Sequence, residues 1–114
     1  MKIVDWSYHR PSCGTCKKTQ DFFAAKGVQV KEEINAKKNR LGNRDVLDLI
    51  HQVVWLYVAR GKGFVEIDLN ENRPSDEALL KLMIGPTGNL RAPAFRVGKK
   101  LVVGFNEEMY QRIG

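Results

Sequence analysis

Two cysteines, Cys13 and Cys16, stand two residues apart where an apolar-rich run gives way to a helical pattern. A thiolate at a helix N-terminus faces unpaired backbone N–H groups and the positive end of the helix dipole, so the pKa of the thiol falls. We expect Cys13 near the N-cap to be exposed, and Cys16 one turn further to be less so. This asymmetry predicts thiol–disulfide exchange, with Cys13 as the nucleophile and Cys16 as the resolving thiol.

The same pair of cysteines has two other conceivable uses. A four-cysteine zinc site needs a second pair, but the chain has only two cysteines. His9 and His51 could complete a set of ligands, yet their spacing is wrong for a zinc finger. We therefore predict no metal and no tightly bound cofactor. An incidental, chemically inert pair stays open as the alternative to redox chemistry.

Composition and charge limit the classes of protein to which the chain can belong. The 114 residues, 43% of them hydrophobic, predict a single domain spanning 1–114. The sequence shows neither a signal peptide nor an 18-residue apolar stretch, which predicts a cytoplasmic protein without membrane contact. A formal charge of +6 favours anionic ligands. Because the densest basic stretch, 37–44, lacks interleaved aromatics, we expect a solvated loop there and no direct nucleic-acid binding.

The order of the expected elements predicts an α/β fold. A strand over 2–8, a helix over 15–26 and a strand over 28–34 form a βαβ unit with a right-handed crossover. A helix is expected from 44 to about 55, although 53–58 is equally compatible with a strand. A second helix over 78–84 precedes a hairpin of strands 92–97 and 101–103, and a helix over 105–113 ends the chain. This order is the thioredoxin-like (glutaredoxin-like) plan, with a central four-stranded mixed sheet flanked by helices and an all-helical insertion.

Several stretches, in order along the chain, resemble the arsenate reductase (ArsC) and Spx branch of the thioredoxin-like proteins. They are residues 8–16, the isolated Arg60, the helix before Gly85, residues 90–93 and residues 101–108. No single stretch is specific, but the ordered set covers nearly the whole chain.

The resemblance implies roles for particular residues. Cys13 would be the catalytic cysteine, Arg60 an oxyanion-binding arginine and Pro93 a cis proline facing the cysteine. Arg10, Arg91 and Thr15 are our candidates for binding the substrate or another anion, since guanidinium groups suit oxyanions and thiolates. The expected substrate is a small thiol or a protein disulfide, and glutathione or thioredoxin is the expected electron donor.

Two departures from the family pattern weaken the expectation of arsenate chemistry. Arsenate reductases of this type carry arginines where this chain has Ala92 and Phe105. Cys16 is instead a feature of Spx-type members, which are transcription regulators that bind the RNA polymerase alpha subunit and usually extend beyond the position of Gly114. The sequence therefore supports a thiol–disulfide oxidoreductase first and a redox-sensing, Spx-like regulator second. A scaffold without catalysis is the third reading.

Overall fold

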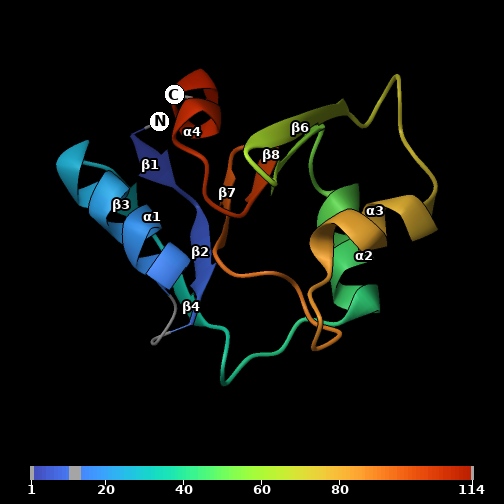
Figure 1. Ribbon diagram of the computed structural model, residues 1–114, viewed down its shortest axis with the longest axis horizontal. Coiled ribbons are helices and arrows are strands. Elements are labelled where there is room, and N and C mark those ends of the chain that lie inside the picture. Colours follow the sequence, from blue (N-terminus) through green and yellow to red (C-terminus); the bar gives the residue numbers. More distant parts are fainter. Residues whose placement is uncertain (1, 11–13, 114) are drawn as a thin grey trace.

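The computed structural model describes residues 2–10 and 14–113, which form one mixed sheet with helices on both faces (Figure 1). The six-stranded sheet has the order β4-β2-β7-β8-β5-β6, and a short parallel pair, β1-β3, lies beside it. The strands are β1 (Ile3–Val4), β2 (Trp6–His9), β3 (Gln29–Val30), β4 (Glu33–Asn35), β5 (Trp55–Arg60), β6 (Gly63–Asp68), β7 (Ala94–Val97) and β8 (Lys100–Val103). The helices are α1 (Gly14–Ala25), α2 (Asn43–His51), α3 (Asp76–Met83) and α4 (Glu107–Ile113).

Four adjacent strands make the thioredoxin-like core that the sequence predicts. β4 runs parallel to β2, β2 is antiparallel to β7, and β7 is antiparallel to β8. The β2–α1–β4 segment is the expected βαβ unit, and Gly98, with a φ of 59°, turns the β7–β8 hairpin. The predicted fold class is confirmed.

The segment between the two halves of the core corrects one prediction. The insertion is not all helical, because the hairpin β5–β6 lies between α2 and α3 and extends the sheet beyond β8. β5 is parallel to β8 on one side and antiparallel to β6 on the other. Its apolar run is buried on both faces, so it shows neither the alternation of a half-buried strand nor a helical stripe. Pairing with a strand on each edge satisfies the backbone hydrogen-bonding groups of this segment, which therefore forms a strand and not a helix.

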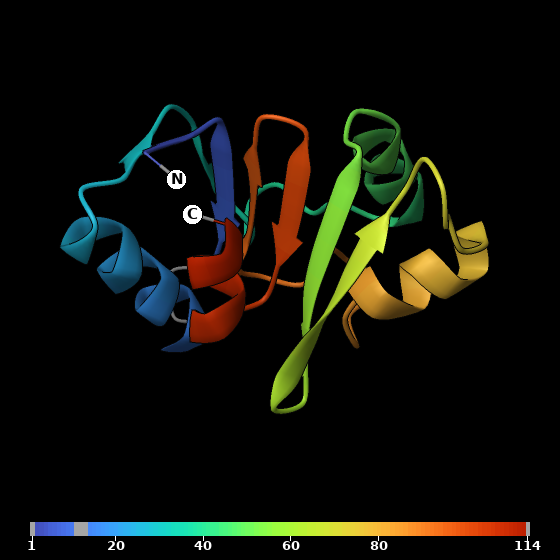
Figure 2. The same ribbon diagram turned by 90° about the horizontal axis from the view of Figure 1, so that it is seen from above.

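The helices cover the two faces of the sheet in pairs. α2 and α3 pack with Leu56, Val58 and Leu101 in one core cluster, whereas α1 and α4 pack with Tyr57 and Val102 in the other. Neighbouring residues of one strand thus enter opposite cores, as the pleat requires. Figure 2 shows α1 and α4 together near β2, and α2 and α3 together near the β5–β6 hairpin.

Helix ends follow local capping chemistry. The Ser75 hydroxyl accepts the N–H of Ala78 at 3.2 Å, and the Asn106 side-chain oxygen accepts that of Met109 at 2.8 Å. α2 begins one residue earlier than predicted, at Asn43. None of the helices within residues 2–10 and 14–113 combines the length and the apolar character needed to cross a membrane.

Candidate redox site at one end of the sheet

The strand ends that carry the predicted site residues all lie at the same end of the sheet. Tyr8 pairs with Ala94 and Ala94 pairs with Val103, so the last residues of β2 and β8 flank the start of β7. Val58 pairs with Val103 in parallel, which brings the end of β5 to the same place. Residues distant in sequence, at the ends of β2, β5 and β8 and before β7, therefore meet beside the start of α1, as can be followed in Figure 1.

Cys16 occupies the first turn of α1, on the face of the helix that packs on the sheet. Its side chain is buried, with 1% of its surface exposed. The backbone N–H of Arg10 donates to Cys16 Sγ at 3.4 Å. Cys13 lies outside the described residues, together with Pro11 and Ser12, so its role stays a prediction. The low exposure of Cys16 agrees with the expectation for a resolving thiol.

The Ala92–Pro93 peptide bond is cis, as the family resemblance implied. The Pro93 carbonyl accepts the N–H of Gly104 at 2.7 Å, which ties the start of β7 to the end of β8. Gly104 has a φ of 88°, and a Cβ there would come within 2.8 Å of the Ala59 Cβ. Only glycine fits this close approach between β5 and β8. The turn carrying the cis proline is thus held from the neighbouring strand.

Tyr110 links this strand end to the cysteine helix through a buried hydroxyl chain. Tyr110 Oη donates to the Gly104 carbonyl at 2.6 Å and lies 2.9 Å from Thr19 Oγ1. A carbonyl only accepts, so the proton of Tyr110 goes to Gly104, and the one proton of the Thr19 hydroxyl is shared between the Tyr110 oxygen at 2.9 Å and the Thr15 carbonyl at 3.3 Å. Burial raises the pKa of Tyr110 far more than its hydrogen bond with Thr19 lowers it, so this hydroxyl stays protonated. Thr19 lies one turn beyond Cys16, so these bonds join the helix that carries the buried thiol to Gly104, whose N–H bonds the Pro93 carbonyl.

We expect Tyr110→Phe to lower the free energy of unfolding by about 1–3 kcal/mol, because the buried Gly104 carbonyl and Thr19 hydroxyl lose a partner. Urea denaturation of the reduced protein measures this difference. Tyr57→Phe is the matched control, since no hydrogen bond of its hydroxyl is present among the described residues. Equal losses in the two variants would show that the hydroxyl chain adds nothing to stability.

Arg91 acts as a brace within the fold. Its Nη1 donates to the Ala59 carbonyl and to the Leu82 carbonyl, both at 3.1 Å. These bonds join the end of β5 to the end of α3, and the backbone N–H of Arg91 donates to the Met83 carbonyl at 2.8 Å. The sequence predicted an anion-binding role for Arg91; its Nη1 is engaged by two carbonyls, and the anion-binding role stays a prediction.

Arg60 and Thr15 lie apart from this brace. Arg60 is the last residue of β5, is exposed, and pairs with Gly63 across the hairpin. The parallel register of β5 and β8 ends at Val58 and Val103, two residues before Arg60 and Phe105. Thr15 is exposed in the first turn of α1, and its carbonyl lies 3.3 Å from Thr19 Oγ1. Their predicted anion-binding roles remain predictions.

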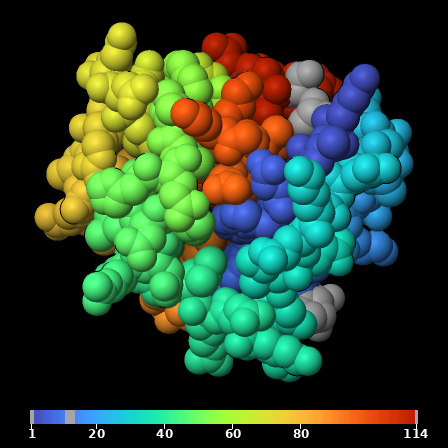
Figure 3. All heavy atoms as spheres, turned by 180° about the vertical axis from the view of Figure 1, so that it is seen from behind, coloured from blue at the N-terminus to red at the C-terminus, as the bar shows by residue number. Residues whose placement is uncertain are grey.

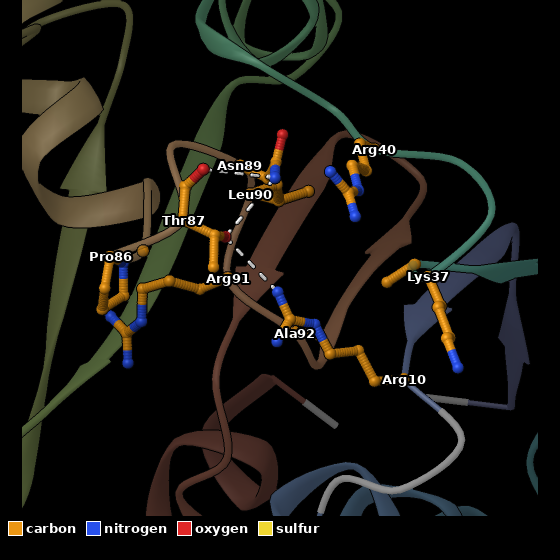
Figure 4. A pocket seen from close by; sticks show the side chains of 11 residues that line it. Arg10, Lys37, Arg40, Pro86, Thr87, Asn89, Leu90, Arg91 and Ala92 are labelled. Atoms are coloured by element: carbon orange, nitrogen blue, oxygen red, sulfur yellow. Dashed lines mark hydrogen bonds between the residues drawn. The ribbon is translucent and has the colours of Figure 1, made fainter.

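A pocket of about 850 Å³ opens at this end of the sheet. Figure 4 shows cationic side chains from three separate segments around it. They are Arg10, Lys37, Arg40 and Arg91, with Thr87, Asn89 and the smaller residues Ala36, Gly85, Pro86, Leu90 and Ala92 completing the lining. The basic segment 37–44 was predicted to be a solvated loop, so sequence reasoning missed Lys37 and Arg40. The only signal in the sequence is the high density of basic residues in this segment. The pocket itself could not be predicted, because its other wall comes from residues 85–92, which are distant in sequence.

The comparisons with known proteins agree with this architecture. A family model described as the ArsC family matches residues 8–113. The regulatory protein MgsR of Bacillus subtilis (strain 168) is 28% identical over 102 residues, covering 87% of this chain and 81% of that protein. The uncharacterized protein YusI of the same organism is 26% identical over 117 residues, covering 91% and 92%. The chain belongs to the ArsC family of thioredoxin-fold proteins.

Proposed function

We propose that this protein is a cytoplasmic thiol–disulfide oxidoreductase that uses Cys13 and Cys16 as a redox pair. One observation carries the proposal: the Cys16 thiol is buried in the first turn of α1, against the backbone of Arg10. A buried thiol in that position is shielded from external disulfides but is within one helical turn of Cys13 in sequence. Such an arrangement favours attack by one thiol and resolution by the other.

The proposed reaction balances as an exchange of two electrons. The Cys13 thiolate attacks one sulfur of the substrate disulfide and expels the other half as a thiolate. Cys16, after losing its proton to solvent, attacks Cys13 and expels the second half. The protein ends as the Cys13–Cys16 disulfide and the substrate as two thiols. Glutathione or thioredoxin would return the pair to the dithiol.

A limiting amount of a neutral disulfide, dithiodipyridine, tests this function. The reduced protein should release two thiopyridone molecules for each disulfide consumed, and its mass should fall by two hydrogens. A release of only one, with a thiopyridyl group left on the protein, would contradict the proposal, because the two cysteines would then react independently.

Arsenate reduction is expected to be weak or absent. Ala92 and Phe105 provide no cationic donor, and Arg91 is bonded to two carbonyls. The absence of two charged hydrogen bonds to an oxyanion costs several kcal/mol, at about 1.5–3 kcal/mol each. Arsenite formation with glutathione or thioredoxin as the donor measures the activity. Efficient turnover would show that other basic residues rebuild the oxyanion site.

A second candidate function is that of an Spx-like redox-sensing regulator. It is favoured by the similarity to MgsR, which is named a regulatory protein, and by retention of Cys16 together with the missing arginines. The same disulfide would then control binding to the RNA polymerase alpha subunit. Capture of purified alpha subunit by the oxidised and the reduced protein tests this, and equal or absent capture in both states argues against it.

A further inference from the structure

We propose that the pocket beside the cysteine helix binds the anionic part of the disulfide substrate, so that the preferred substrates carry a carboxylate or phosphate near the sulfur–sulfur bond. This inference rests on the proposed redox function and names its substrate class. The residues that would provide the selectivity are Arg10, Lys37 and Arg40, with Thr87 and Asn89 as neutral donors.

The positive charge of the pocket is not compensated by any of the described residues that line it. Four of its lining residues are cationic, and the pocket residues include no carboxylate. Within residues 2–10 and 14–113, the ion pairs are Arg73–Asp76, Arg96–Asp5 and Arg112–Glu66, none of which involves a pocket residue. A concave surface with charge of one sign concentrates ligands of the opposite sign.

The pocket side chains are arranged so that one group could contact several of them. Figure 4 shows the guanidinium group of Arg10 turned towards Thr87 and that of Arg40 on the other side of Asn89, whereas that of Arg91 lies near Pro86. Arg10 Nη2 donates to Thr87 Oγ1 at 3.4 Å, and Asn89 Nδ2 lies 3.4 Å from the same oxygen. Guanidinium, hydroxyl and amide groups are the donors that bind oxyanions.

The same pocket has an apolar part that suits an organic body. Pro86, Leu90 and Ala92 contribute to its wall. A volume of about 850 Å³ lies in the range of sites that bind small molecules. Cationic donors beside apolar surface favour a small organic anion over a bare inorganic ion. An acidic peptide of a protein partner would need a longer surface, so we assign the site to a small ligand.

The position of the pocket connects it to the redox pair. Arg10 directly precedes the segment that contains Cys13, and its backbone N–H binds Cys16 Sγ. Ala92, on another wall, is joined by the cis bond to Pro93. Figure 3 shows from behind how the segment after β4, which contributes Lys37 and Arg40, spreads over the same end of the molecule. An anion held here would keep the attached disulfide next to the start of α1.

Two disulfides of opposite character test the inference. Dithiobis(nitrobenzoate) carries two carboxylates, whereas dithiodipyridine is neutral, and both release a coloured thiol. The measured quantity is the ratio of the rate constant for the anionic disulfide to that for the neutral one, because the ratio cancels any change in thiol reactivity. In Lys37→Gln/Arg40→Gln we expect this ratio to fall about threefold to tenfold, as for two partly exposed charge contacts. The control Lys26→Gln/Lys31→Gln removes the same charge from exposed positions away from the pocket and should leave the ratio unchanged.

Competition distinguishes the two kinds of anion. Inhibition of the anionic reaction by malonate but not by pyrophosphate identifies a carboxylate site, and the reverse identifies a phosphate site. The inference is overturned if both double variants change the ratio equally, or if neither anion competes and the ratio in Lys37→Gln/Arg40→Gln equals that of the wild type. Failure of the redox function itself has a different signature, since the neutral disulfide would then yield only one thiol per disulfide in the wild-type protein.

Discussion

Replacing Cys16 with serine should halve the yield of thiol from a limiting neutral disulfide and leave the other half of the reagent attached to Cys13. The first attack does not need Cys16, but the resolution step does, because a serine hydroxyl cannot displace a thiolate under these conditions. Intact-protein mass spectrometry after the reaction should show a stable adduct. The wild-type protein should show none.

The complementary variant, Cys13→Ser, should lose the fast reaction altogether. Cys16 has only 1% of its surface exposed, so a disulfide in solution cannot reach its sulfur without local opening of the fold. Alkylation of Cys16 by iodoacetamide should be slow in this variant. In Cys16→Ser, the pH dependence of alkylation should give Cys13 a pKa below the ~8.5 of a free thiol. Equal rates for the two thiols would remove the assignment of attacker and resolver.

The second large effect concerns stability. Arg91→Met should lower the free energy of unfolding by about 3 kcal/mol. Each hydrogen bond from a charged donor contributes about 1.5–3 kcal/mol, and the two bonds contribute less than their full sum because the guanidinium is partly exposed. Ala59 and Leu82 would each have a carbonyl without its present donor. Urea denaturation of the reduced protein measures the loss.

Arg60→Met is the matched control for this prediction. It removes the same charge from the residue that follows Ala59, but Arg60 is exposed and its side chain makes no hydrogen bond to the described part of the chain. This substitution should change the free energy of unfolding by no more than about 0.5 kcal/mol. A destabilisation of Arg91→Met no larger than that of Arg60→Met would show that Arg91 is free to serve a ligand, as the sequence first suggested.

The core of the fold could be predicted from the sequence because its signals are local. Ser75 and Asn106 cap the helices that were expected after them, and Gly98 turns the expected hairpin. The β5 strand could not be assigned, because a run buried on both faces carries no periodicity. Its partners, β6 and β8, lie on either side of it only in the folded chain.

The site was predictable in its chemistry but not in its geometry. The spacing of Cys13 and Cys16 and the place of Pro93 are visible in the sequence, and the cis bond is confirmed. The use of Arg91 as a brace was not visible, because the Ala59 carbonyl that it binds lies 32 residues away in sequence. Tyr110 was missed for the same reason, since its partner Thr19 comes from the opposite end of the chain.

The redox equilibrium of the cysteine pair tests the central claim most directly. The protein is equilibrated in glutathione buffers with an increasing ratio of oxidised to reduced glutathione and is then alkylated. Its mass is measured by intact-protein mass spectrometry. We predict a single transition in which Cys13 and Cys16 lose their alkylation together, leaving a chain two hydrogens lighter than the unmodified dithiol, as for one two-electron couple. Two separate transitions, each adding one glutathione to the protein, would contradict the account.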